Sequence, residues 1–410
     1  MKSNEINIIS SVLIFIMIFS ADPGKVLAQQ SEEKPGEKIK GVSTSEDLNG
    51  TGDSNEKKTV HYYFYKEDDS GSRAFHTPWN LFIEGGFGAL HNRKIDNFHF
   101  RDGADSLWYN ISHPFSVISD YGWKNFFMDE VVPNPSGNDN YIANWTWHFI
   151  GGGFRCKMME EYFIYHGYSY PKLMAWITMY SMHFTNEAIQ QETLHGPVDP
   201  IADLYIFDFL GKLLFEIDEV SYFASEYLHL TDWTYQTQLN PQKLRLLNNG
   251  ELFWVRLKIY GKLSGSILTG EQINSFGLTW EFSNGHQLSL GWGGKAKTFT
   301  TTEKGRPEME QFSISAGLYY SIADNPMLVI TYEPEVKMQD SPDYDPRKIN
   351  EYSEKLIINL YPGLLKIFGR TFGLSLQYNK EAFFFGFTSA LLPVGIIGST
   401  PQKEKYDRCY

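Results

Sequence analysis

The second half of the chain alternates apolar residues with small or polar ones, and this period of two constrains the fold most. Two such segments flank Asn284-Gly285, which is the strongest short signal for a β-hairpin. Successive side chains of a strand point to opposite faces, so each segment predicts a strand with one apolar face. Before the turn, the apolar parity comprises Phe276, Leu278, Trp280 and Phe282, and the other parity comprises Ser275, Gly277, Thr279 and Glu281.

The alternation continues to about Leu392 and predicts an antiparallel meander over residues 226–392. A soluble β-sandwich would show the same alternation. A secretion signal, an inner face rich in Gly and Ser, and aromatic residues at strand ends favour a membrane barrel instead. We therefore predict a mainly β fold with an α insert: an antiparallel membrane β-barrel of roughly 10–12 strands, with one to three strands before the insert and closure by the meander.

The N-terminus predicts export. Lys2 precedes an apolar run from Ile8 to Phe19, and Val26-Leu27-Ala28 provides small residues before a cleavage point, so residues 1–28 read as a signal peptide. The run is too short to anchor the chain across a bilayer. Residues 29–58 contain almost no large apolar side chain and predict a disordered linker.

The net charge argues against one class of partner, and the cysteine content leaves the question of a disulfide open. The net charge is −13 with 21% charged residues, so the chain has no basic character that would suggest nucleic acid. Its two cysteines, Cys156 and Cys409, are far apart in the sequence, and whether they pair stays open. The expected partner is outer-membrane lipid, and the oligomeric state stays open.

Residues 59–139 are expected to form N-terminal strands and loops. Val60 to Tyr65 predicts a short strand, and Trp79 to Leu90 a strand bent at its glycines. Pro114 would interrupt a ladder, so residues 105–123 read as a strand end or loop. Pro133 to Asn138 is a loop by composition.

Residues 140–218 change to a helical period and predict an insert of three helices. The first is expected over about 141–166, with Gly151-Gly-Gly153 marking close packing or a break, because glycine costs roughly 1 kcal/mol in a helix interior. The second begins at Pro171 and runs to about 190. The third helix is expected to begin with Asp199 as its N-cap, followed by Pro200 at the first helical position. This insert is expected to act as a helical plug of the lumen or to cap its mouth.

The insert also carries the best candidate for chemistry. Convergence of its helices would bring together a histidine and four carboxylates, which could bind a divalent metal or serve as acid and base. Ordinary helix capping and ion pairing also explain these residue types. No His-Glu-x-x-His motif is present, the metal is unknown, and no cofactor is expected. The candidate catalytic residues are His148, Glu187, Glu192, Asp199 and Asp203.

A lipid-hydrolase dyad of His286 and Ser289 is rejected. The two residues are three apart in a predicted strand and therefore face opposite sides. His286 shares the parity of the apolar residue Leu288.

The helical stretch resembles an uncharacterised family of Gram-negative envelope proteins, known only as a domain of unknown function. Asn144, His148 and Gly151 match its first part, and Asn186-Glu187 stands at its second. The third part is matched from Glu192 through Asp199 to Asp203. Two positions depart from the pattern: Phe149 stands where the family tends to have Pro, and Asn186 where it tends to have Trp. The resemblance implies an outer-membrane or periplasm-facing location and no established activity.

These observations predict an outer-membrane barrel of the Gram-negative cell envelope with unknown substrate, ending in a polar tail over residues 393–410, with the last strand ending near Leu392. A plugged barrel or a binding or structural role is favoured. The alternatives are a membrane-embedded hydrolase or lipid-modifying enzyme using the cluster of the insert, and a soluble periplasmic β-rich protein.

Overall fold

The computed structural model describes residues 61–88, 100–133, 144–193, 198–234, 236–242, 245–248, 250–270, 273–301, 307–334, 354–379, 382–390 and 392–400. The chain separates into two units, Tyr62–Phe163 with Tyr170–Tyr410, and Met1–His61 with Ile164–Ser169. The fold below is that of the first unit. The predicted signal peptide and linker, the loop over 134–138, Cys409 and residues 401–410 of the predicted tail lie outside the described residues.

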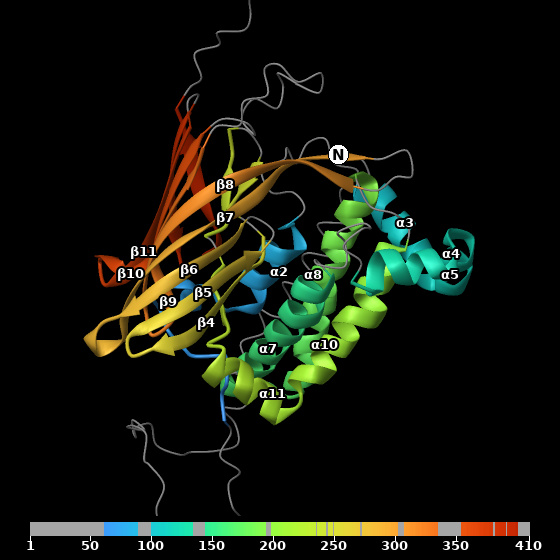
Figure 1. Cartoon of the computed structure of the whole chain (residues 1–410), viewed down its shortest axis with the longest axis horizontal. Coiled ribbons are helices and arrows are strands. Elements are labelled where there is room, and N and C mark those ends of the chain that lie inside the picture. The colour runs from blue at the N-terminus through green and yellow to red at the C-terminus, as the bar shows by residue number, and fades with distance from the viewer. Residues whose placement is uncertain are drawn as a thin grey trace, which may run out of the picture. The chain divides into compact units, whose positions relative to one another are not determined.

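A single sheet of 13 strands dominates the fold (Figure 1). Its strands from β4 to β13 follow one another as neighbours in sequence order, and each consecutive pair is antiparallel. This is the predicted meander. Its members are β4 (Leu252–Tyr260), β5 (Leu263–Gly270), β6 (Asn274–Glu281), β7 (His286–Thr301), β8 (Pro307–Ile322), β9 (Asn325–Glu333), β10 (Lys355–Ile367), β11 (Arg370–Asn379), β12 (Phe383–Ser389) and β13 (Leu392–Ser399).

Three short strands extend the meander at its two edges. β1 (Thr231–Asp232) pairs with β4, whereas β2 (Gln238–Asn240) pairs in parallel with β13 and is followed by β3 (Arg245–Leu247). Six residue steps from Asp232 to Gln238 reach at most about 22 Å, so the sheet must curl to bring its far edges so close together. The parallel β13–β2 pair makes the sheet mixed, and because β1 and β3 do not pair among the described strands, it is not closed.

The two faces of the curled sheet have opposite character, as the alternation predicts. Apolar side chains of the outer face are exposed: Phe276 by 62%, Leu290 by 61% and Ile314 by 67%. Polar side chains of the inner face are buried, with Thr279 and Ser375 at 0%. This arrangement is inverted relative to a water-soluble sheet, in which the apolar face is the buried one.

Residues that flank the edge strands β2 and β3 contact the inner face of the meander. Trp233 stacks on Trp254 of β4 at 4.0 Å between ring centroids and lies edge-on to Tyr319 of β8. Further along, Gln236 Nε2 donates a hydrogen bond to the Leu360 carbonyl of β10 at 2.9 Å, and Asn248 Nδ2 donates one to Ser375 Oγ of β11 at 2.9 Å. One stretch of chain therefore supplies partners to strands across much of the sheet.

A second segment, residues 68–76, covers the same face near β9 to β11. The Gly71 N–H donates to the Pro362 carbonyl at 2.8 Å, and Thr371 Oγ1 donates to the Asp69 carbonyl at 2.8 Å. Asn325 Nδ2 donates to the Ser70 carbonyl at 2.9 Å. These contacts to the inner face come from residues outside the three predicted helices.

Before the predicted insert the chain is helical, so the expected N-terminal strands are wrong over the described residues. The elements are η2 (Ser72–Phe75), α2 (Pro78–Gly86), α3 (Phe100–Ser112), α4 (Pro114–Tyr121), α5 (Trp123–Phe126) and η5 (Phe127–Val131).

The bent strand expected from Trp79 is α2 instead. Thr77 Oγ1 accepts a hydrogen bond from the Asn80 N–H, and Pro78 occupies the first turn, where its missing N–H costs nothing. A Cβ on Gly85 would lie 2.5 Å from Met182 Sδ of α8. The glycine therefore serves close helix packing and not a strand bend.

Two further predictions of strand structure in this region are wrong. Residues 61–65 form no strand, because the backbone N–H groups of Tyr63, Phe64 and Tyr65 donate to the Glu161 carboxylate at 2.8–2.9 Å. Over 105–123, Pro114 opens helix α4 and does not end a strand.

The insert contains the three predicted helices, interrupted by π-helical turns. The first is η6 (Asn144–Gly152) with α7 (Gly153–Tyr165), the second is α8 (Pro171–Thr193), and the third is α9 (Asp199–Ala202), η7 (Asp203–Phe207) and α10 (Asp208–Phe215). α11 (Asp218–Tyr222) and η8 (Phe223–Tyr227) lead into the sheet.

The glycines of the first helix mark close packing, as predicted. A Cβ on Gly153 would lie 2.4 Å from the Gly211 carbonyl oxygen, and one on Gly211 would lie 2.1 Å from the Phe149 carbonyl oxygen. The described helices include none that is both long and apolar enough to cross a bilayer. At the other end of the chain, the final strand extends to Ser399 and does not end near Leu392, because β13 pairs with β12 up to Phe384 and Ser399.

We expect Trp233→Ala to lower the free energy of unfolding by about 3–5 kcal/mol, because it leaves a cavity between Trp254 and Tyr319. Denaturant unfolding followed by fluorescence measures the change. Trp292→Ala is the matched control, since Trp292 is 58% exposed. Equal losses in the two variants would contradict the assignment of Trp233 to the core.

Candidate functional site

A cluster of buried ionisable side chains lies among the helices of the insert. His148 belongs to the π-helix η6, and Asp203 and Asp208 begin η7 and α10. In an α-helix, residues five apart lie on different faces, whereas the i→i+5 bonds of a π-helix stack them. The π-helical turn over Asp203–Phe207 therefore directs both aspartates toward His148.

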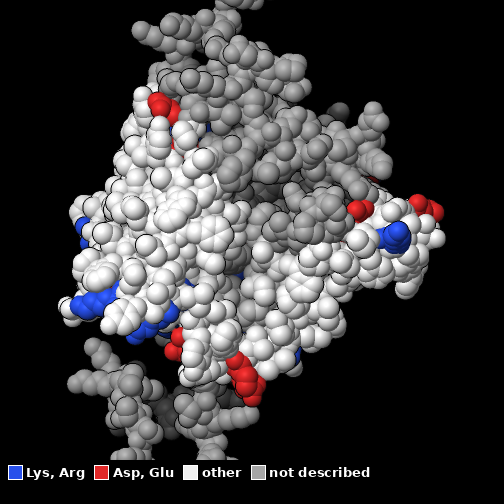
Figure 2. Space-filling model, in the orientation of Figure 1, with Lys and Arg blue, Asp and Glu red and all other residues white. Residues whose placement is uncertain are grey.

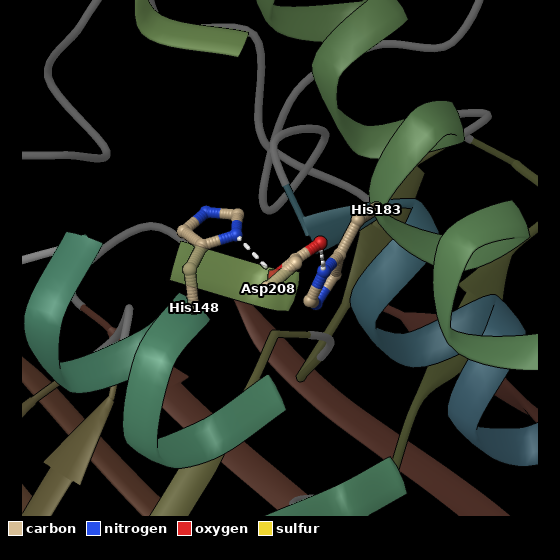
Figure 3. A group of neighbouring side chains, drawn as sticks. All are labelled: His148, His183 and Asp208. Atoms are coloured by element: carbon tan, nitrogen blue, oxygen red, sulfur yellow. Dashed lines mark hydrogen bonds and ion pairs between the residues drawn. The ribbon is translucent and has the colours of Figure 1, made fainter. Parts of the chain in front are cut away.

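Asp208 lies between two histidines (Figure 3). Its Oδ1 is 3.1 Å from His148 Nδ1, and its Oδ2 is 2.5 Å from His183 Nδ1. His183 comes from α8, and Asp208 is fully buried. Both contacts are hydrogen bonds in which a ring N–H donates to the ionised carboxylate, which can only accept.

The other nitrogen of His148 points away from Asp208 (Figure 3). His148 Nε2 lies 3.4 Å from Asp203 Oδ2. One atom each of His148, Glu187 and Asp203 lie within 4.8 Å of one another, and so do ligand atoms of His148, His183 and Asp208. Each set contains the donor types that bind divalent transition metals.

Cations gather on the Asp208 side of the cluster. Burial alone would lower the pKa of His183, but the facing Asp208 carboxylate raises this pKa to about 9. Lys212 Nζ lies 3.8 Å from Asp208 Oδ2 and 3.4 Å from the centre of the Tyr180 ring. Burial opposes ionisation of Asp208, but His183 and Lys212 hold its pKa well below the usual range.

The Asp203 side has the opposite electrostatic character. Burial raises the pKa of Asp203 well above its usual range, and the neighbouring carboxylates of Asp199, Glu187, Asp208 and Glu130 raise it further. Asp203 is 2% exposed, and its Oδ1 accepts no hydrogen bond from the described residues. This side of His148 is therefore a buried, electronegative environment.

A second buried network joins the helices to the sheet. Arg155 of α7 is fully buried, and its Nε donates to Asp232 Oδ2 of β1 at 2.6 Å. Its Nη1 donates to Glu251 Oε1 at 2.8 Å and its Nη2 to Thr234 Oγ1 at 2.9 Å. His183 Nε2 lies 3.8 Å from the same Glu251 oxygen, so the Arg155 network continues into the histidine cluster.

Of the five candidate residues, the structure brings His148, Glu187 and Asp203 together. Asp199 is buried and interacts electrostatically with Asp203. It is the first residue of α9, with Val198 at the N-cap position, so the expected Asp199 cap is wrong. The side chain of Glu192 lies outside the described residues.

Sequence reasoning missed His183, Lys212 and Glu251, and did not assign Asp208 to the site. His183 stands inside the apolar run of the second helix, which hides it among core residues. A histidine at a buried helical position is itself a signal, because a buried polar group needs a partner. The spacing of five residues between Asp203 and Asp208 did not indicate a shared site, because residues five apart lie on one face only in a π-helix.

The rejected dyad of His286 and Ser289 is separated in the structure as well. His286 Nδ1 bonds with Tyr320 Oη at 2.7 Å, whereas Ser289 Oγ bonds with Thr279 Oγ1 at 2.8 Å on the buried face. Cys156 carries a free, buried thiol whose pKa burial raises to about 12, which makes it a poor nucleophile.

Comparison of the chain with protein-family models, curated protein sequences and solved structures found no match. The resemblance of the helical stretch to the envelope family therefore stays a prediction.

We expect Arg155→Met to lower the free energy of unfolding by about 3–5 kcal/mol, because it leaves the carboxylates of Asp232, Glu251 and Glu84 buried without their shared cation. Equilibrium unfolding in denaturant measures the loss. Arg101→Met is the control: Arg101 pairs with Asp105 on the surface, where such pairs contribute about 0–1 kcal/mol. A loss below about 1 kcal/mol for Arg155→Met would show that the network does not hold helices and sheet together.

Proposed function

We propose that this protein resides in the outer membrane of a Gram-negative cell envelope and has a binding or structural role there. The curled sheet would complete a barrel-like wall whose apolar outer face lies in lipid. The observation that carries the proposal is the inverted sheet: buried Ser, Thr, Asn and Gln inside, and exposed Phe, Trp, Leu and Ile outside. Barrels of the outer membrane have this polarity.

The distribution of charge supports the same placement. In Figure 2 the surface over the sheet is largely free of charged side chains, and Lys and Arg gather near the hairpin turns at its margin. Lys258 and Lys262 flank the β4–β5 turn, and Lys366 and Arg370 flank the β10–β11 turn, all four exposed. A contiguous apolar surface of this extent is costly in water and favourable in a bilayer.

The aromatic residues add a second feature of membrane strands. Trp280 and Phe282 lie at the turn end of β6, while Phe276 and Trp292 are register partners nearer its other end. All four are exposed by 46–62%. Aromatic rings at both ends of an apolar band match the interfacial girdles of membrane barrels.

The filled interior favours a plugged or structural protein over an open channel. Residues 68–76 and 233–248 hydrogen-bond with inner-face groups of β9 to β11, so the polar side of the wall faces protein. In this proposal residues 68–76 and 233–248 would serve as the plug, a role that the sequence pattern predicted for the three helices.

The alternative is a membrane-embedded hydrolase or lipid-modifying enzyme that uses the buried cluster. The convergence of His148 with Glu187 and Asp203 favours it. Against it, His148 is 8% exposed and Glu187 and Asp203 are 0% and 2% exposed, which leaves a lipid substrate little access. We therefore favour the non-enzymatic role.

Substitution of Leu290 by arginine tests the lipid placement. Leu290 lies in β7 on the outer face and is 61% exposed. Against lipid, Leu290→Arg is expected to cost about 2–4 kcal/mol of unfolding free energy, whereas a water-exposed site would change by about 0.5 kcal/mol or less. Denaturant unfolding of protein reconstituted in lipid vesicles measures the difference.

Phe368→Arg is the matched control, because Phe368 is fully exposed at the β10–β11 turn and should tolerate the charge. Heat-modifiable gel migration of the wild-type chain from outer-membrane fractions provides an independent readout. The proposal would be contradicted if the wild-type chain is a stable monomer in buffer without detergent and Leu290→Arg leaves the free energy of unfolding unchanged.

A further inference from the structure

We propose that His148, Glu187 and Asp203 bind a divalent first-row transition-metal ion, with Asp208 as the positioning residue that orients His148. The three ligands come from η6, α8 and η7, so the ion would join three helical segments of the insert. The site is independent of the membrane placement proposed above.

The separation of the ligand atoms fits an ion better than a hydrogen bond. His148 Nε2 and Asp203 Oδ2 are 3.4 Å apart, long for a hydrogen bond between these atoms. Two ligands at metal–ligand distances of about 2.1 Å in a tetrahedral site are separated by about 3.4 Å. One oxygen of Glu187 lies within 4.8 Å of a ligand atom of each of these two residues and completes a set of three donors.

Asp208 prepares His148 for this role. An ionised carboxylate can only accept hydrogen bonds, so His148 Nδ1 donates to Asp208 Oδ1 at 3.1 Å and the ring turns Nε2 toward Asp203. A carboxylate that accepts the second N–H of a ligating histidine is the usual support of a protein metal site. Figure 3 shows this relay, with Asp208 on one side of the ring and Nε2 directed away.

Asp203 supplies an independent observation. Its Oδ1 is buried and accepts no hydrogen bond from the described residues, in a side chain that is 98% enclosed, as its 2% exposure implies. Leaving a buried carboxylate oxygen without a donor is costly. Coordination of a cation through both Asp203 oxygens would give Oδ1 a partner and offset the repulsion from the neighbouring carboxylates.

The second possible set, His148, His183 and Asp208, is less suited to an ion. The Asp208 oxygens already accept hydrogen bonds from the two rings at 2.5 and 3.1 Å, which are shorter than ligand separations in a tetrahedral site. Lys212, 3.8 Å from Asp208, adds a positive charge that would repel a metal there. The ion therefore belongs on the far side of His148.

Metal content and affinity test the proposal. The full chain, purified in detergent and loaded with Zn²⁺, should hold roughly one ion per chain by elemental analysis. Asp203→Asn, Glu187→Gln and His148→Ala should each lose the bound ion. Asp208→Asn should weaken Zn²⁺ affinity about 10–100-fold, measured by competition with a fluorescent chelator. Substitution by Co²⁺ should give a visible absorption band that the Asp203→Asn variant lacks.

Controls separate ligand loss from misfolding. Asp120→Asn and His286→Ala change the same residue types outside the cluster and should bind as wild type does. Each variant is checked for native tryptophan fluorescence before titration. A wild-type chain that neither holds nor takes up Zn²⁺, or folded ligand variants that bind as wild type does, would overturn the proposal. The proposal would also be overturned if His183→Gln loses Zn²⁺ binding while Glu187→Gln keeps it, because the ion would then lie in the second set.

Discussion

The structure depends on one constraint: a sheet that turns its polar face inward buries polar side chains that need hydrogen-bond partners. Buried polar groups without hydrogen bonds are costly, so an inward polar face cannot be left bare within protein. Some partners come from within the sheet, as between Thr279 and Ser289, and others from residues outside the meander, as in the bond from Asn248 to Ser375. Curling, the contacts to the inner face and the exposed apolar face are consequences of the same alternation.

The same constraint explains how the helices attach. Arg155 of α7 is fully buried and donates to two acceptors on the sheet side, Asp232 of β1 and Glu251 next to β4. Glu251 also lies 3.8 Å from His183, so the network runs without interruption into the cluster around Asp208. Because removal of one buried charge leaves others uncompensated, these residues couple the stability of the sheet to that of the helical insert.

Sequence reasoning succeeded where one physical period governs a segment. The parity of Phe276 and Thr279 identified the two faces of the sheet, and Pro171 and Pro200 located helix starts. It failed at Gly85, which read as a bend in a strand but allows close approach to Met182 of another helix. A glycine indicates that another part of the chain approaches the backbone closely. Whether the glycine lies in a helix or in a strand depends on that tertiary partner.

The site was only partly predictable for a similar reason. His148, Glu187 and Asp203 were recognisable as residue types, but their convergence depends on π-helical turns that no 3.6-residue period reveals. His183 was hidden in an apolar run, and Glu251 lies far from the insert in sequence, just before β4. Long-range pairing between a helix and a strand leaves no local pattern.

Site-directed spin labelling tests the central claim most directly. In a background with both cysteines replaced by serine, single labels at Phe276, Leu290 and Ile314 would be compared with one at Phe368 in lipid vesicles. We predict that the labels at the first three positions are accessible to oxygen dissolved in the bilayer and inaccessible to a water-soluble nickel reagent. The label at Phe368 should show the reverse accessibility. Ready access of the nickel reagent to all four positions would contradict the proposal that the outer face of the sheet lies in lipid.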